Sequence, residues 1–558
     1  MVRRVFNFMH KEVRGLHQAA YILALFAIGS QLLAVVRDRM LAHLFGAGSE
    51  LDLYYAAFKI PDLMYVLFAS VLSVYVLLPF VSRYTEEGGA QAGAKVISQI
   101  FSVFLVIFSC ISLVLAATAV WYVPILFPGF GDQSALLIAL IQILLFQSFL
   151  LGVSTLCGVV TQISHRFILY AISPLLYNVG IIIGLVFLYP HFGLVGLVMG
   201  VVLGAFGHLA IQLPYVIKSE YRFGLVKDID FKLIKDVFAV SIPRALTLSV
   251  NQIVLLVMVG MASTMVAGSV SVFQFAFNLQ SVPLAVVGMS YSVAAFPTLS
   301  ILLAKKKHQE FNLQLLTALR HIIFWSVPIA GLVIVLRAQI VRVLLGSGAF
   351  DWGDTRLTAA VLAVFVVSLI AQSILLLVIR AFYAGGKTFT PLWVATISSG
   401  VSIVLAIVLH KLYLTSVSFQ GIIEATFRLE NVSGTAVLML ALAFIVGQFL
   451  QLILLMILST KIFAISYRPL VRLSLQSLCA AFGGALTAYG ILAFVVDGIN
   501  QDTFIGISLQ GLTAGIGGVI MVVIIYRLLK SPELFEIYRS FHSRIFKTDV
   551  IAPQPDTL

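Results

Sequence analysis

Residues 96–121 read VISQIFSVFLVIFSCISLVLAATAVW and contain no charged side chain. As an α-helix this stretch would be about 39 Å long at 1.5 Å per residue, enough to cross the roughly 30 Å hydrocarbon core of a bilayer. A helix is required there because lipid offers no hydrogen-bond partner to free backbone groups. The stretch therefore predicts a membrane-spanning helix.

The rest of the chain repeats this pattern, and fourteen apolar runs are separated by polar segments. The predicted spans are 17–36, 53–81, 96–121, 135–162, 167–189, 192–216, 237–261, 268–303, 314–336, 357–380, 389–410, 434–459, 470–495 and 504–527. Of the 558 residues, 61% are hydrophobic and 10% charged, against roughly 25% charged in soluble domains. We expect an all-α polytopic membrane protein with about 14 transmembrane helices. A soluble enzyme, a disordered scaffold and a nucleic-acid-binding domain are excluded.

The net charge of +12 follows from the distribution of Lys and Arg between the two sides of the membrane. If the N-terminus is cytoplasmic, the inner segments hold 26 of the 35 basic residues and the outer segments hold seven. Cytoplasmic loops are typically rich in Lys and Arg, so the distribution predicts that both termini are inside. It also accounts for the charge without a nucleic-acid partner.

Three pairs of matching positions indicate an internal repeat. Lys59 and Asn278 are 219 residues apart, Pro79 and Pro297 are 218 apart, and Pro174 and Pro391 are 217 apart. Chance is the alternative, because proline is common in membrane helices. A repeat of six spans, an even number, predicts two parallel six-helix lobes followed by two C-terminal helices.

This repeat divides the chain into six predicted parts. They are a cytoplasmic N-terminus (1–16), an N-lobe (17–216), a linker (217–236), a C-lobe (237–459), spans 13 and 14 (460–530) and a cytoplasmic tail (531–558). The linker mixes basic residues with Phe and Leu, which favours an amphipathic helix on the anionic inner leaflet. A plain solvated linker is the alternative.

No catalytic constellation is found in the sequence. It has no HExxH pair, no GxSxG elbow and no GxxxxGK[ST] phosphate loop. The three cysteines, Cys110, Cys157 and Cys479, lie in apolar runs, so neither a disulfide nor a metal site is predicted. We expect no enzyme activity, no metal and no cofactor.

Charged residues within spans are the main candidates for function, since each costs several kcal/mol in the bilayer unless paired or hydrated. Lys59 and Asp62 lie three apart on the second span, with Pro61 between them as an expected kink. They are expected to line a polar cavity in which Lys59 attracts an anionic headgroup. The alternative is an ion pair between the two.

Other charged residues lie at the ends of spans. Arg37 and Asp38 end the first span and Asp52 opens the second, which indicates either an outer gate or a cluster of interfacial charges. Arg244 follows Pro243 at the start of the seventh span. It either faces the cavity or extends to the inner headgroups.

Three segments resemble the MurJ/MviN family. They are RDRMLAHLFGAGSELDLYYAAFKIPDL (37–63), ISPLLYN (172–178) and RAFYAGGKTFTP (380–391), and they occur in the order found in that family. The resemblance runs along nearly the whole chain and implies fourteen spans. It also implies membership of the multidrug/oligosaccharidyl-lipid/polysaccharide exporter superfamily. Members flip lipid II, an undecaprenyl-pyrophosphate-linked peptidoglycan precursor, across the bacterial cytoplasmic membrane.

The resemblance also suggests site residues. Family positions are matched by Arg37, Asp38, Asp52, Lys59 and Arg380. Arg37 and Lys59 are expected as cavity residues. The gate or structural residues are expected to be Asp38, Asp52 and Arg380.

Several positions depart from the family pattern. Gln31 and Asn278 stand at cavity positions where the family has arginine, and Tyr65 and Val66 replace a double arginine. Met258 replaces a commonly polar residue associated with cation binding in some members. A further departure is Lys387-Thr388, where the family usually has Asp-Thr.

The sequence thus predicts a flippase that moves a lipid-linked precursor by alternating access for cell-wall synthesis. We expect membrane potential or a gradient of Na⁺ or H⁺ to drive it. Expected partners are the polyprenyl-linked precursor, membrane lipids and cell-wall synthesis proteins. The alternatives are an exporter of another lipid-linked oligosaccharide, an exporter of amphiphilic cations, and a non-transporting membrane scaffold derived from a flippase.

Overall fold

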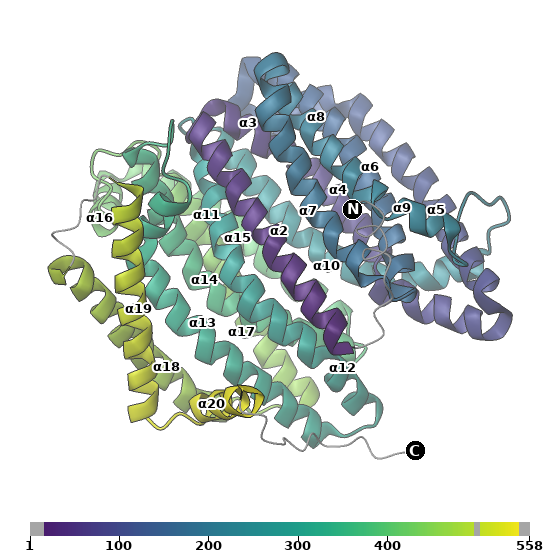
Figure 1. The fold of residues 1–558 in the computed structure, drawn as a ribbon. Helices are drawn as coiled ribbons and strands as arrows, with labels where there is room; N and C mark the ends of the chain where they lie inside the picture. Colours follow the sequence, from purple (N-terminus) through teal and green to yellow (C-terminus); the bar gives the residue numbers. More distant parts are fainter. Residues whose placement is uncertain (1–15, 496–502, 546–558) are drawn as a thin grey trace. The chain divides into compact units, whose positions relative to one another are not determined.

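The computed structural model describes residues 16–495 and 503–545, and within these ranges the chain forms helices and no strands (Figure 1). The α-helices are α2 (Leu16–Phe45), α3 (Ser49–Ala57), α4 (Lys59–Val71), α5 (Val74–Leu126), α6 (Ser134–Ile163), α7 (Phe167–Ile183), α8 (Tyr189–Ala210), α9 (Leu213–Lys218), α10 (Phe231–Ser263), α11 (Ser269–Leu284), α12 (Ser290–Ala304), α13 (His308–Leu344), α14 (Trp352–Ala384), α15 (Phe389–Thr415), α16 (Val417–Phe427), α17 (Val437–Phe463), α18 (Arg468–Gly490), α19 (Phe504–Leu528) and α20 (Pro532–Ile545). Single helical turns follow α7 (η2, Gly184–Leu188), α11 (η3, Ala285–Met289) and α18 (η4, Ile491–Val495), and η1 (Pro128–Gln133) precedes α6.

The predicted fold class is confirmed. Eleven helical stretches of the described residues are long and apolar enough to cross a membrane. Two of them contain a break: non-helical Gly88 and Gly89 interrupt α5, and Gly193 turns the chain at the start of the sixth predicted span. With α2 as a further apolar helix of 30 residues, these stretches account for the fourteen predicted crossings.

The second predicted span, 53–81, is not one helix. It is divided into α3, α4 and the start of α5, with breaks at Phe58 and at Leu72 and Ser73. Pro61 was expected to kink this span. The break falls where α3 ends, because Pro61 has no N–H to donate to the carbonyl of Ala57, four residues earlier.

The amphipathic helix expected over 217–236 does not form. Residues 219–230 are irregular and α10 begins at Phe231. Polar side chains of α5 bind this backbone: the N–H of Val226 donates to Ser102 Oγ at 2.9 Å and the N–H of Asp230 to Gln99 Oε1 at 3.2 Å. Asp230 then caps α10 by accepting hydrogen bonds from the first turn of that helix.

The chain divides into two compact units. Unit 1 comprises the described residues as far as Phe275 together with Leu344–Val361 and Thr388–Gly447, and unit 2 comprises Ala276–Val343, Leu362–Lys387 and the described residues from Gln448 onward. These units do not coincide with the two predicted lobes. The predicted C-lobe begins with α10, but α10 packs against α4, α5 and α15 within unit 1. The repeat and its lobes therefore stay a prediction.

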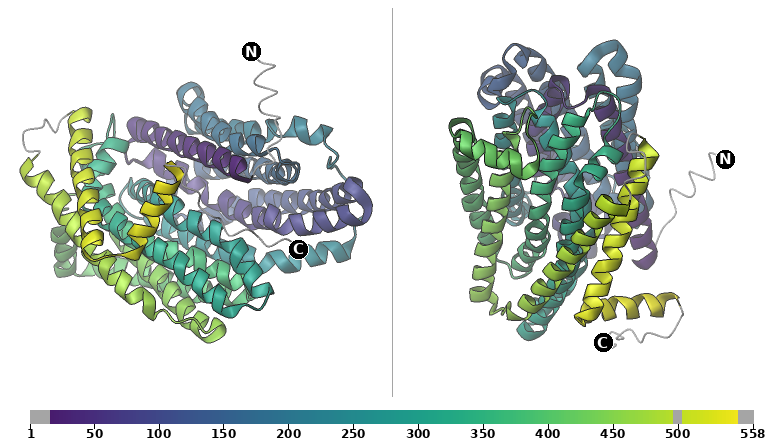
Figure 2. Two further views of the ribbon diagram at one scale, coloured as in Figure 1. Left: turned by 60° about the horizontal axis from the view of Figure 1, so that its bottom comes forward. Right: turned by 90° about the vertical axis from the view of Figure 1, so that its left-hand side faces the viewer.

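Close packing in unit 1 joins α2 to α7 and α7 to α8. A Cβ added at Gly180 of α7 would lie 2.2 Å from the Cα of Gly204 in α8, so the small residues allow the two backbones to approach. In unit 2, α18 and α19 pack as a pair and α20 turns away from the end of α19 (Figure 2).

Candidate functional site

A buried carboxylate joins α3 to the start of α11. Asp52 is 4% exposed, and its Oδ2 accepts a hydrogen bond from the N–H of Gly268 at 2.7 Å. Its Oδ1 accepts from the N–H and the hydroxyl of Ser271, at 2.7 and 2.6 Å. The first N–H groups of a helix have no partner within the helix and favour an anion. We call this arrangement, Asp52 with Gly268 and Ser271, the Asp52 latch.

Glycine is required at position 268 of the latch. Gly268 has φ of +92°, and a Cβ there would lie 2.0 Å from the carbonyl oxygen of Ala47. The chain turns tightly at this point so that its N–H can reach the carboxylate. The turn thus fixes the distance between α3 and α11.

Two further hydrogen bonds hold the same end of unit 1 together. The N–H of Ala349 donates to the carbonyl of His43 at 2.9 Å, and the N–H of Ala47 donates to Asp354 Oδ2 at 3.1 Å. The segments 43–52, 268–271 and 347–354 are therefore joined to one another. We call this region the closed end.

Lys59, predicted as a cavity residue, makes a second link between α4 and α11. Its Nζ donates to Gln274 Oε1 at 2.6 Å, and the side chain is 8% exposed. Asp62 lies one turn further along α4 and is half-buried. Within the described residues Lys59 donates to Gln274 and forms no ion pair with Asp62. The structure therefore differs from the alternative in which these two residues form an ion pair.

Arg37 and Asp38 form a cluster between α2 and α7. The Arg37 guanidinium donates to Asp38 Oδ1 through Nε at 2.9 Å and Nη2 at 2.7 Å, and through Nη1 to Asn178 Oδ1 at 2.9 Å. Asn178 is the last residue of the ISPLLYN segment. Two of the segments that resemble the family are thereby brought into contact.

The remaining predicted site residues are not part of these clusters. Gln31 is exposed on α2, and Arg244 is half-buried on α10. Asn278 and Arg380 belong to unit 2 and are half-buried. Arg380 Nη2 approaches Met289 Sδ at 3.7 Å.

Sequence reasoning missed Gly268, Ser271, Gln274 and Asn178, the partners of the predicted charges. The first two had a recognisable signal, because Gly-Ser-Val-Ser at 268–271 precedes an apolar run and has the composition of a helix start. The amides of Gln274 and Asn178 had none, since their role depends on which helix packs against them. Among the described residues no group of three or more His, Cys, Asp or Glu is arranged to hold a metal ion.

Many membrane-spanning helices, with buried charged side chains linking their ends, define a polytopic membrane protein. Residues 41–497 match the family model of the lipid II flippase MurJ. The chain belongs to this family, as the sequence resemblance predicted.

Two curated relatives illustrate the match. The probable lipid II flippase MurJ of Thermotoga maritima is 26% identical over 383 residues, which cover 68% of this chain and 76% of the relative. The lipid II flippase MurJ of Burkholderia cenocepacia is 25% identical over 390 residues, with the same two coverages.

Solved structures show the same fold. A lipid II flippase MurJ in an inward closed conformation superposes with a TM-score of 0.69 at 23% identity, covering 91% of this chain and 99% of that chain. An inward-facing multidrug resistance MATE family transporter of the MOP superfamily gives a TM-score of 0.63 at 12% identity, covering 78% of this chain and 94% of that one.

Proposed function

We propose that this chain translocates lipid II across the bacterial cytoplasmic membrane by alternating access, for use in cell-wall synthesis. The match of residues 41–497 to the lipid II flippase family is the observation that carries this proposal. The helical membrane fold and the Asp52 latch give it a physical basis, because alternating access needs an end of the bundle that closes and opens.

In this proposal the closed end faces the outside of the cell. It contains the ends of segments poor in Lys and Arg, whereas the basic residues concentrate in the connections at the opposite ends of the same helices. Both termini then lie inside. A precursor made in the cytoplasm would therefore reach the protein from the side opposite the Asp52 latch.

Opening of the closed end requires the Asp52 carboxylate to exchange its three donors for water. A hydrogen bond to a charged group contributes about 1.5–3 kcal/mol, so water must enter as the latch separates. One elementary charge moved through 100 mV supplies about 2.3 kcal/mol, comparable with one such hydrogen bond. We propose that the membrane potential or an ion gradient biases this equilibrium.

In this proposal the cationic side chains near the Asp52 latch attract the anionic headgroup of the precursor. Lys59 donates to the neutral amide of Gln274 and forms no ion pair with a carboxylate within the described residues. A pyrophosphate that replaced Gln274 would gain a charged hydrogen bond. Arg37 is already held by Asp38 and Asn178, so we assign it a supporting role.

Depletion of the protein in its native bacterium tests the cargo. We expect lipid II to accumulate in the inner leaflet. The measurement is its accessibility to an enzyme or a label added from outside, which should fall. If lipid II stays accessible from outside after depletion, while growth stops for another reason, the proposal is wrong.

A second candidate cargo is a different lipid-linked oligosaccharide with a less anionic headgroup. Gln31, Tyr65 and Asn278 replace arginines of the family pattern, and arginine is the side chain best suited to bind pyrophosphate at two points. Competition between lipid II and a polyprenyl monophosphate-linked saccharide for the purified protein distinguishes the two. Tighter binding of the monophosphate would favour the second candidate.

A further inference from the structure

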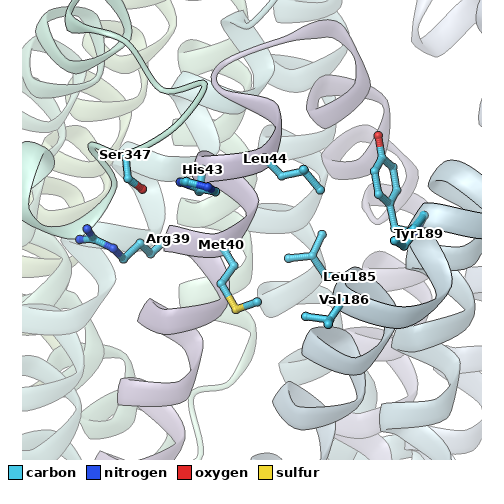
Figure 3. Close-up of a pocket in the computed structure, with 9 residues that line it drawn as sticks. Arg39, Met40, His43, Leu44, Leu185, Val186, Tyr189 and Ser347 are labelled. Carbon is cyan, nitrogen blue, oxygen red and sulfur yellow. The ribbon is translucent and has the colours of Figure 1, made fainter.

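A groove of about 710 Å³ crosses the outer face of α2 beside the closed end. Figure 3 shows Arg39 and Ser347 on one side of α2, and Leu185 and Val186 of η2 across from it. His43 lies next to Ser347. The groove is therefore polar and cationic on one side and apolar on the other.

The apolar side of the groove has a fixed wall. The ring of Tyr189 packs edge-on against Phe45 with 4.9 Å between ring centroids, and its hydroxyl donates to Glu50 Oε2 at 2.7 Å. Met40 and Leu44 of α2 form the surface between the two sides.

An apolar stripe on α2 leads to the polar side of the groove. Leu25, Ile28, Leu32 and Val36 are 68%, 60%, 63% and 47% exposed. At 100° per residue they lie with Arg39 within an arc of about 80° on one face of the helix. From Leu25 to Arg39 the helix rises about 21 Å, more than the roughly 15 Å hydrocarbon depth of one leaflet.

We propose that this groove is a binding site for an anionic phospholipid of the leaflet at the closed end. The phosphate lies against Arg39 and His43, and one acyl chain follows the apolar stripe of α2. A guanidinium matches a phosphate in charge and geometry, and a basic residue at the membrane surface favours anionic over zwitterionic lipid.

The position of the groove links the lipid to the closed end. Ser347 belongs to the turn whose Ala349 N–H donates to the carbonyl of His43 at 2.9 Å. A phosphate bound to Arg39 and His43 would lie against this turn, and so would stabilise the closed end. The lipid acts as a regulator of the transporter and is distinct from its cargo.

Native mass spectrometry of the full-length protein with added phosphatidylglycerol or phosphatidylcholine of the same chains tests the proposal. We expect a preference for phosphatidylglycerol of roughly fivefold, lost in Arg39→Gln. The matched control is Arg83→Gln, an exposed arginine of α5 paired with Glu87. It should keep the preference. An equal preference in wild type and Arg39→Gln would overturn the site.

A second variant tests the apolar side. Val186→Trp fills the groove at a side chain that is 44% exposed, and should weaken retention of both lipids without lowering the melting temperature. Unchanged retention would contradict the proposed chain path. Undecaprenyl phosphate is the competitor: if it displaces phosphatidylglycerol far more effectively than a second phosphatidylglycerol does, the groove binds the polyprenyl tail and the phospholipid assignment is wrong.

Discussion

At the residue scale, Asp52 is a carboxylate whose oxygens accept three hydrogen bonds from the start of a helix. The burial of a charge is tolerated only when such donors compensate it. The same group can therefore hold two helices together and release them when water replaces the donors. In the proposed mechanism, the gate depends on this residue.

Gly268→Ala should destabilise the closed end. The methyl group would meet the carbonyl of Ala47, at 2.0 Å, and the residue would keep a φ of +92°. Strain of this kind costs of order 1–3 kcal/mol. We expect a lower melting temperature in detergent.

The control for this variant is Gly193→Ala. Gly193 also has positive φ, +57°, but nothing lies within 4 Å of an added Cβ. It should lower the melting temperature less. Equal losses in the two variants would mean that the approach to Ala47 is unimportant.

The partners of the charged residues mark the limit of sequence reasoning at this scale. Asp52, Lys59 and Arg37 stand out because charges are costly in a bilayer. Their partners are backbone N–H groups and neutral amides, which are unremarkable in sequence. Only the packing of α11 against α3 and of α7 against α2 identifies Ser271 and Asn178.

At the element scale, α20 is fastened to α13 in unit 2. The Arg320 guanidinium donates to Glu533 Oε1 at 2.6 Å, and the Ser531 hydroxyl donates to Oε2 at 2.6 Å. Burial acts to raise the pKa of Glu533, but the hydrogen bonds from Ser531 and Arg320 outweigh it, and the pKa lies below its usual value. A second pair joins His321 and Glu536 at 3.2 Å.

The attachment of α20 should therefore depend on pH. A carboxylate with a lowered pKa in the folded state stabilises the fold fully above its unfolded pKa, about 4.3, and loses this contribution as the pH falls through the folded value. We expect hydrogen exchange of α20 to accelerate below about pH 4.3 relative to that of α18. In Glu533→Gln the exchange should already be fast at pH 7. Slow exchange in this variant at pH 7 would show that other contacts hold the helix.

The sequence predicted most of the helices but not where they break. Fourteen apolar runs correspond to the observed helices because a backbone in lipid has no alternative to a helix. The division of 53–81 and the irregular 219–230 depend on specific partners. Ser102 and Gln99 bind the 219–230 backbone, and periodicity contains no information about such contacts.

At the scale of the whole molecule, the proposed topology rests on the distribution of Lys and Arg between the two sides of the membrane. Glu50 at the closed end and Glu86 in the connection within α5 are both exposed. Cysteines introduced at these positions, in a chain with Cys110, Cys157 and Cys479 replaced by alanine, report the two sides of the membrane.

We expect a membrane-impermeant maleimide to label Glu50→Cys in intact cells and Glu86→Cys only after permeabilisation, because basic connections stay in the cytoplasm. The two variants are controls for each other. If Glu86→Cys alone were labelled in intact cells, the orientation would be the opposite of the one proposed, and the closed end would lie inside.

Transport of lipid II by reconstituted protein is the most direct test of the proposed gate. In proteoliposomes, the wild-type chain should move labelled lipid II between leaflets. Asp52→Asn should do so at least about tenfold more slowly, because the loss of one charged hydrogen bond lowers, by about that factor, the population of the closed end that must re-form before the opposite side opens. Asp228→Asn, which removes an exposed carboxylate paired with Lys95, should match the wild type. Equal rates for wild type and Asp52→Asn, or no lipid II movement by the wild type, would contradict the account.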